Sequence, residues 1–105
     1  MSNKKTNKTL TKVADDEWSL SRKRGGGKLR REVWADDDGK VIQYNLAYIN
    51  HEIYNGDNGR VLGYDNAHGH HHRHYMGEIE AIDFKGFEDI ELQFEQACHK
   101  LWSKG

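Results

Sequence analysis

The sequence predicts an α+β fold, a small and mainly antiparallel β-sheet covered by one C-terminal amphipathic helix. Two patterns support this prediction. Residues 28–84 contain short runs of β-branched and aromatic residues that are separated by turn signals. Residues 87–102 instead repeat apolar residues at spacings of three and four, which is typical of one helical face. Because such a helix must bury its apolar face, we expect it to pack on the sheet.

The strands are predicted from alternation and from the turns between them. Asp36–Gly39 and Asn55–Gly59 are rich in Asp, Asn and Gly, the residues that favour tight turns. We expect four strands, at residues 29–35, 41–54, 60–64 and 79–84. The helix begins with acidic Glu88 and Asp89 and ends near Lys100, an arrangement that favours the helix dipole.

The first part of the chain has a different composition. Residues 1–27 are rich in Ser, Asn, Lys and Thr and end in three consecutive glycines. Residues 1–28 hold eight Lys or Arg against three acidic residues, whereas residues 29–105 hold eight basic and fourteen acidic residues. We therefore predict a basic flexible tail at 1–27 and a domain at 28–105. A basic arm of this kind is typical of a contact with nucleic acid or another acidic partner.

Composition also excludes several classes of protein. The single cysteine, Cys98, excludes an internal disulfide framework and a paired-cysteine zinc site. No run of residues approaches the roughly 18 apolar residues of a membrane span, and the basic N-terminus lacks the apolar stretch of a secretory signal. We expect a cytoplasmic protein that makes no membrane contact.

Histidines make residues 64–75 the most informative segment. Five of the seven histidines fall between positions 68 and 74, directly after a Tyr-Asp-Asn sequence. In an extended chain, even-numbered and odd-numbered side chains point to opposite faces. One face would then carry His68, His70, His72 and His74, and the other His71, Arg73 and Tyr75.

Three interpretations of this segment remain open. The first is acid–base catalysis on RNA, in which one imidazole deprotonates the 2′-hydroxyl and another protonates the leaving 5′-oxygen. Arg73 would hold the phosphate, Asp65 would orient an imidazole or act as a base, and no metal or other cofactor is required. The second is a metal site built from His-x-His pairs and Asp65. The third is a solvated or purely structural loop.

The same segment resembles a known family. The sequence Gly59-Arg60-Val61-Leu62-Gly63-Tyr64-Asp65-Asn66-Ala67 comes first. The sequence His71-His72-Arg73-His74 and an amphipathic helix follow. Together they are similar to the TumE-like toxins of bacterial type II toxin–antitoxin systems, over roughly residues 41–104. The resemblance implies a small intracellular toxin that acts as a ribonuclease and is silenced by an antitoxin encoded beside it. It singles out Tyr64, Asp65, Asn66, His71, His72, Arg73 and His74.

These observations combine into one functional hypothesis, a toxin that is a metal-independent endoribonuclease using histidine acid–base chemistry. Its expected partners are a cognate antitoxin and an RNA substrate, with a homodimer also considered. The expected catalytic residues are Asp65, His71, His72, Arg73 and His74. The expected substrate-binding residues are Tyr64, Asn66, His68, His70, Tyr75, Arg22, Lys23 and Arg24. The alternative is a non-catalytic metal-binding or regulatory protein with a histidine-rich site.

Overall fold

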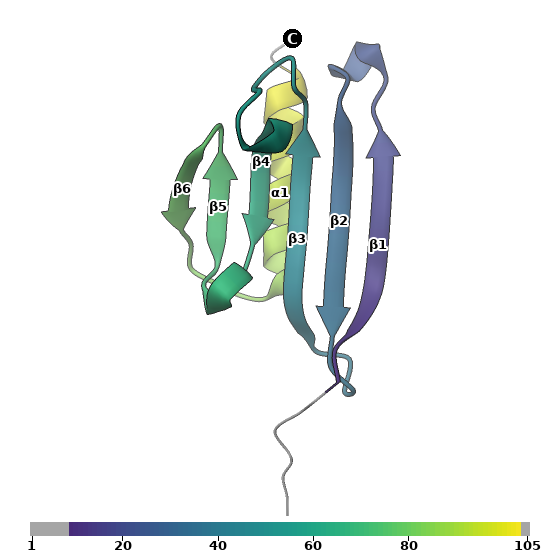
Figure 1. Cartoon of the computed structure of the whole chain (residues 1–105), viewed down its shortest axis with the longest axis vertical. Coiled ribbons are helices and arrows are strands. Elements are labelled where there is room, and N and C mark those ends of the chain that lie inside the picture. The colour runs from purple at the N-terminus through teal and green to yellow at the C-terminus, as the bar shows by residue number, and fades with distance from the viewer. Residues whose placement is uncertain (1–8, 104–105) are drawn as a thin grey trace, which may run out of the picture.

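The described residues form one six-stranded antiparallel sheet and one α-helix (Figure 1). The computed structural model describes residues 9–103, without the side chain of His68. The strands lie side by side in chain order: β1 (Thr11–Ser19), β2 (Lys28–Ala35), β3 (Val41–Ile49), β4 (Arg60–Asp65), β5 (His72–Tyr75) and β6 (Glu78–Ala81). The helix α1 (Phe87–Ser103) follows the last strand. The prediction of an antiparallel sheet with a C-terminal helix is confirmed.

Short turns connect the strands and fix their register. The connection from β5 to β6 consists of Met76 and Gly77, which have φ angles of 46° and 86°. Positive φ at both positions is the type I′ geometry, whose twist matches the twist of the two flanking strands. Short 3-10 turns lie at Arg22–Arg24, Asp57–Gly59 and Ala67–Gly69, each in a connection between strands.

The hydrophobic core lies between α1 and the middle of the sheet. The helix packs on β3 and β4, as Figure 1 shows from the side of the sheet opposite the helix. Tyr48, Leu62 and Ile90 are each 0% exposed, and the Tyr64 ring meets the Phe94 ring edge-on at a centroid distance of 6.1 Å. Among the described residues, no helix is long and apolar enough to cross a membrane.

The predicted strand at 41–54 is shorter in the structure, because Asn50 ends it. The buried Asn50 side chain donates to the carbonyl oxygen of Gly25 and to the Tyr48 hydroxyl. Its own oxygen accepts the backbone N–H of Glu52, which folds the chain into a turn. Strand β3 therefore ends at Ile49, and the side chain of Asn50 connects this end to the β1–β2 connection.

The tail prediction was wrong for residues 11–19, which form the edge strand β1 and pair with the whole of β2. The charged residues of this segment favour a disordered tail when the segment is considered alone. In the structure they face opposite charges on β2. Asp15 contacts Arg30, Asp16 contacts Arg31, and Lys12 contacts Glu32, at 2.7, 3.6 and 2.8 Å. Cross-strand pairs of opposite charge stabilise a sheet. The part of the tail prediction that concerns residues 1–8 lies outside the described residues.

We expect the backbone amides of β1 that face β2 to be protected from hydrogen exchange. Their exchange should be at least about a hundredfold slower than in an unstructured chain, because it requires the β1–β2 ladder to open. Residue-resolved exchange measured by NMR on the full chain tests this. If every amide from residue 11 to residue 19 exchanges at the unstructured rate, the flexible-tail prediction is restored.

Candidate functional site

The sheet register divides the predicted site residues between two faces. Opposite residues of an antiparallel pair share a face, and Tyr64 is opposite Arg73 while Asp65 is opposite His72. Tyr64 packs on the helix residue Phe94, so Tyr64 and Arg73 lie on the helix side. Asp65 and His72 therefore lie on the other face, together with His74, which is opposite Gly63. We call this second face the open face.

An arginine that sequence reasoning missed organises the open face. The guanidinium of Arg60 donates to Asp57 at 2.8 Å, to Asp65 at 3.3 Å and to Nδ1 of His74 at 3.1 Å. His74 itself is buried, with 9% of its surface exposed. Arg60, Asp65 and His74 thus form one connected cluster on β4 and β5.

Gly63 makes room for this arrangement. A Cβ at position 63 would lie 2.6 Å from Cδ of Arg60, which is too close for any real contact. The Arg60 side chain therefore passes directly over the glycine to reach residues further along β4. The sequence signal for this contact is a glycine within a strand, three residues after an arginine. A glycine within a strand often marks a place where another group approaches the backbone closely.

The hydrogen bonds around His74 determine where its proton lies. A guanidinium only donates, so Nδ1 of His74 must accept from Arg60 and carries no proton. The proton of the neutral ring is then on Nε2, which lies 3.0 Å from Oδ2 of Asp65. This contact has an ion-pair distance but lacks the alignment of a hydrogen bond. Both nitrogens of His74 therefore face protein groups.

Two further imidazoles continue from His74 along the segment. The rings of His72 and His74 have centroids 6.3 Å apart, and those of His70 and His72 are 6.0 Å apart. His70 is exposed and His72 is half-buried, so both are more accessible to a ligand than His74. The predicted alternation is thus found for His72 and His74, while the side chain of His68 lies outside the described residues.

His71 occupies a different environment. Its Nδ1 lies 2.8 Å from the Tyr44 hydroxyl, and its ring stacks on Phe84 at a centroid distance of 3.9 Å. Burial lowers the pKa of His71, with a smaller contribution from His72, so the neutral ring is favoured. Burial, followed by the charge of Asp65, raises the pKa of Tyr44 to about 12, so its hydroxyl keeps its proton.

Arg73 and its neighbours are engaged on the helix side of the sheet. Arg73 donates to the Tyr64 hydroxyl at 3.2 Å and to Glu80 at 3.1 Å. Its guanidinium also lies over the Tyr75 ring, 5.2 Å from the centroid. The structure therefore brings Arg73, Tyr64 and Tyr75 together but separates them from His72 and His74.

Asn66 has a structural position at the end of β4. Its side-chain oxygen accepts the backbone N–H of Tyr44, and its amide donates to the carbonyl of Ile42 at 2.7 Å. Asp65 accepts the backbone N–H of Ala67 in the same turn. The amide of Asn66 thus joins the turn after β4 to the start of β3 and helps to place Asp65.

The predicted basic contact residues lie elsewhere. Arg22, Lys23 and Arg24 form the 3-10 turn that connects β1 to β2. In Figure 1 this turn is at the upper end of the sheet, whereas the turn at Ala67–Gly69 is at the lower end. The structure does not bring these basic residues to the histidines.

A shallow depression on the open face adjoins the cluster. It has a volume of about 280 Å³ and is lined by residues of β2, β3 and β4, among them Glu32, Trp34, Asn45, Arg60 and Asp65. The oxygen Oδ1 of Asn45 is buried with no hydrogen-bond partner among the described residues. The depression therefore offers the indole ring of Trp34 beside the Arg60 cluster, while the unpaired oxygen of Asn45 is buried beneath it.

The geometry also bears on two other chemistries, metal binding and catalysis by a cysteine thiol. Among the described side chains, no three His, Cys, Asp or Glu are grouped so that they could hold a metal ion. Cys98 is buried in the core, and burial raises the pKa of its thiol to about 12. A thiol with such a pKa is not a nucleophile at neutral pH.

Replacing Gly63 with alanine should displace Arg60 from His74. The φ angle of Gly63 is outside the left-handed range, so the effect comes from the contact with Arg60 rather than from the backbone. We expect a loss of about 1–3 kcal/mol in unfolding free energy, which is typical of overpacking. The ¹⁵N shifts of His74 should also move away from those of a ring protonated only at Nε2. Unchanged His74 shifts in folded Gly63→Ala would contradict this geometry.

The lowered pKa of His71 predicts a pH-dependent stability. The unfolded chain has a histidine pKa of about 6.5, so below that pH it binds more protons than the folded chain. Stability should therefore fall as the pH is lowered through about 6.5 toward the folded-state pKa. Urea unfolding at about pH 7.5 and about pH 5 should show a smaller loss in His71→Gln than in the parent chain. His99→Gln, on an exposed helix position, is the control and should keep the parental loss.

No curated protein and no solved structure gave a significant match. A family model described as Toxin TumE matches residues 27–101, which include β2 to β6, the Arg60 cluster and nearly all of α1. This match spans well over half of the sequence and agrees with the resemblance carried by residues 59–74. The chain therefore belongs to the TumE toxin family.

Proposed function

We propose that this toxin is a metal-independent endoribonuclease and that its active site is on the open face of the sheet. The observation that supports this proposal most is the row formed by His70, His72 and His74. Two of these imidazoles are accessible, and the third is held in one orientation by Arg60 and Asp65. An imidazole can both accept and donate a proton, so two accessible rings are sufficient for acid–base chemistry.

His72 and His70 would carry out the two proton transfers. In-line attack places the 2′-oxygen and the leaving 5′-oxygen on opposite sides of the phosphorus, so the base and the acid must be separate groups. One imidazole takes the proton of the 2′-hydroxyl, and the other gives a proton to the 5′-oxygen. The products are a 2′,3′-cyclic phosphate and a free 5′-hydroxyl.

Arg60, Asp65 and His74 would act mainly through position and charge. Arg60 contacts His74 in this row, and it takes the phosphate-binding role that was expected for Arg73. Asp65 and His74 hold its guanidinium in place, and Arg60 in turn fixes the ring of His74 beside His72. Trp34, in the adjoining depression, offers a ring on which a base can stack.

The family supports a second partner besides RNA. Membership in a toxin family implies an antitoxin that binds the chain and silences it. A toxin that cleaves RNA needs such a partner, because free activity would stop the growth of the cell that makes it.

Substitution of the accessible histidines tests the proposal. His72→Gln and His70→Gln should each lower the rate of RNA cleavage by a factor of about 10² to 10⁴, the range for loss of a general acid or base. They should also relieve the inhibition of bacterial growth. The matched control is His99→Gln, which makes the same change on α1, far from the open face, and should keep both activities. Circular dichroism and thermal unfolding verify that all three variants are folded.

The reaction conditions separate this proposal from the metal-binding alternative. Cleavage should persist in EDTA, and its rate should have a bell-shaped pH dependence between about pH 5 and pH 8. The new ends should carry a 2′,3′-cyclic phosphate or a 3′-phosphate. Activity that is lost in EDTA and restored only by added metal, or 5′-phosphate products, would contradict the proposal. A chain that binds metal and never cleaves RNA would favour the non-catalytic alternative.

A further inference from the structure

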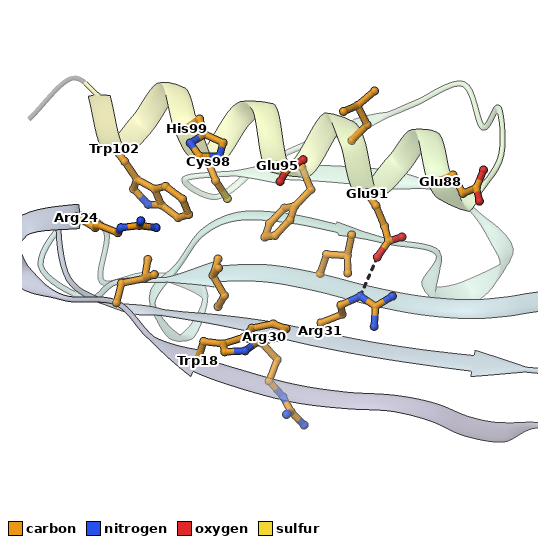
Figure 2. A pocket seen from close by; sticks show the side chains of 15 residues that line it. Trp18, Arg24, Arg30, Arg31, Glu88, Glu91, Glu95, Cys98, His99 and Trp102 are labelled. Atoms are coloured by element: carbon orange, nitrogen blue, oxygen red, sulfur yellow. Dashed lines mark hydrogen bonds and ion pairs between the residues drawn. The ribbon is translucent and has the colours of Figure 1, made fainter.

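The helix side of the sheet has a groove that the proposed catalytic site does not use. It lies between α1 and the β1–β2 hairpin and has a volume of about 610 Å³. Figure 2 shows Cys98 and Trp102 extending toward it from the helix, with Trp18 on the sheet side. Arg24 lies beside Trp102 at one end, and the ion pair between Arg31 and Glu91, at 2.8 Å, spans the groove near the other.

The surface of this groove combines exposed apolar groups with unpaired acids. Trp18 is 48% exposed and Leu92 is 50% exposed, which is unusual for two large apolar residues that line one groove. Glu88, Leu92 and Glu95 follow one another at spacings of four and three, so they lie along one line of the helix. Glu88 and Glu95 have no ion-pair partner among the described residues. The helix therefore presents an acidic row interrupted by a leucine.

The dimensions of the uncovered area match those of one helix. The helix α1 packs mainly on β3 and β4 and reaches β2 through the ion pair of Glu91 with Arg31, so most of the helix side of β1 and β2 lies beside the helix (Figure 1). Two strands about 4.8 Å apart occupy about 10 Å, and an α-helix is about 10 Å in diameter. A second helix could thus lie beside α1 on the same sheet, with its apolar side chains inserted between Trp18 and Leu92.

We propose that this groove is the docking site of an amphipathic helix of the antitoxin. The apolar side of that helix covers Trp18 and Leu92, and its Lys or Arg residues face Glu88 and Glu95. Three arginines also line the groove, but Arg30 and Arg31 already pair with acidic residues, so the unpaired charges that the helix presents to a partner are those of Glu88 and Glu95. Recognition of an amphipathic helix in an apolar groove is a common mode of peptide binding. The proposal rests on the toxin role and is independent of the ribonuclease chemistry.

The test uses the product of the gene adjacent to that of this toxin as the binding partner. Binding is measured by calorimetry with the full chain carrying His72→Gln, so that expression does not depend on toxicity. In that background, Leu92→Lys and Glu95→Lys should each raise the Kd at least about tenfold, as expected at the centre of an interface. The matched controls are Ile53→Lys and Glu52→Lys, which make the same changes in the loop after β3 and should leave the Kd unchanged.

A growth assay gives a second readout in the chain that keeps His72. Leu92→Lys and Glu95→Lys should remain toxic and should no longer be neutralised by the co-expressed partner, whereas the loop controls should be neutralised. The proposal is overturned if the adjacent product does not bind, or if it binds the folded groove variants with an unchanged Kd. It is also overturned if the chain alone is a dimer that Leu92→Lys dissociates, because the groove would then bind a second copy. Failure of RNA cleavage changes none of these binding results, so the two proposals fail separately.

Discussion

The structure depends on one constraint, which is that a single 17-residue helix covers a sheet of six strands. Six strands span about 24 Å across the sheet, whereas a helix covers only about 10 Å. The helix can therefore bury one side of two strands, and the core consists mainly of β3 and β4 residues that face it. Each outer strand must be held by other interactions, and those interactions decide which surfaces remain free.

At β1, ion pairs provide the stabilisation that packing against the helix provides at β3 and β4. Lys12 and Arg30 both contact Asp15 and Glu32, so four charges share one network across β1 and β2. The cations hold the pKa of Asp15 and of Glu32 below the ordinary range, through Lys12 first in both cases. A lowered carboxylate pKa stabilises the folded chain at neutral pH, and this stabilisation is lost as the pH falls toward the folded-state value. Individual exposed pairs contribute little, but a network on a paired strand also opposes slipping of the register.

The same network explains which parts of the fold could be predicted from the sequence. Periodicity sufficed for α1 and for the strands that contact it, because burial imposes a regular pattern on those segments. Strand β1 has no such pattern, since its side chains are stabilised by opposite charges on a strand that follows later in the chain. The local sequence of residues 11–19 carries no information about those partners, so its composition alone predicts a tail.

For the site, the sequence predicts that alternate residues of the histidine segment lie on opposite faces of the sheet, but not which of them face the helix. The register between β4 and β5 determines which alternate side chains of β5 face the helix. It places Arg73 on the helix side and His74 on the open face. The role of Arg60 could not be predicted from the sequence for a related reason. The register of β3 and β4 shifts between Tyr48 and Ile49, and the arginine then reaches residues further along its own strand by crossing Gly63. Contacts of this kind follow from an irregularity that no local spacing reveals.

The two proposed sites lie on opposite faces, and this geometry limits how a partner can silence the toxin. A helix that lies in the groove beside α1 cannot itself touch His70 or His72, because the whole sheet is between them. The sheet has two edges, β1 and β6, and a partner that reaches both faces must pass around one of them (Figure 1). A partner that also covered the histidines would therefore need, besides the helix in the groove, a segment that passes around one of these edges. The β1 edge borders the groove, whereas the β6 edge is next to β5, which carries His72 and His74, so the two edges lead to the two proposed sites from opposite sides of the sheet.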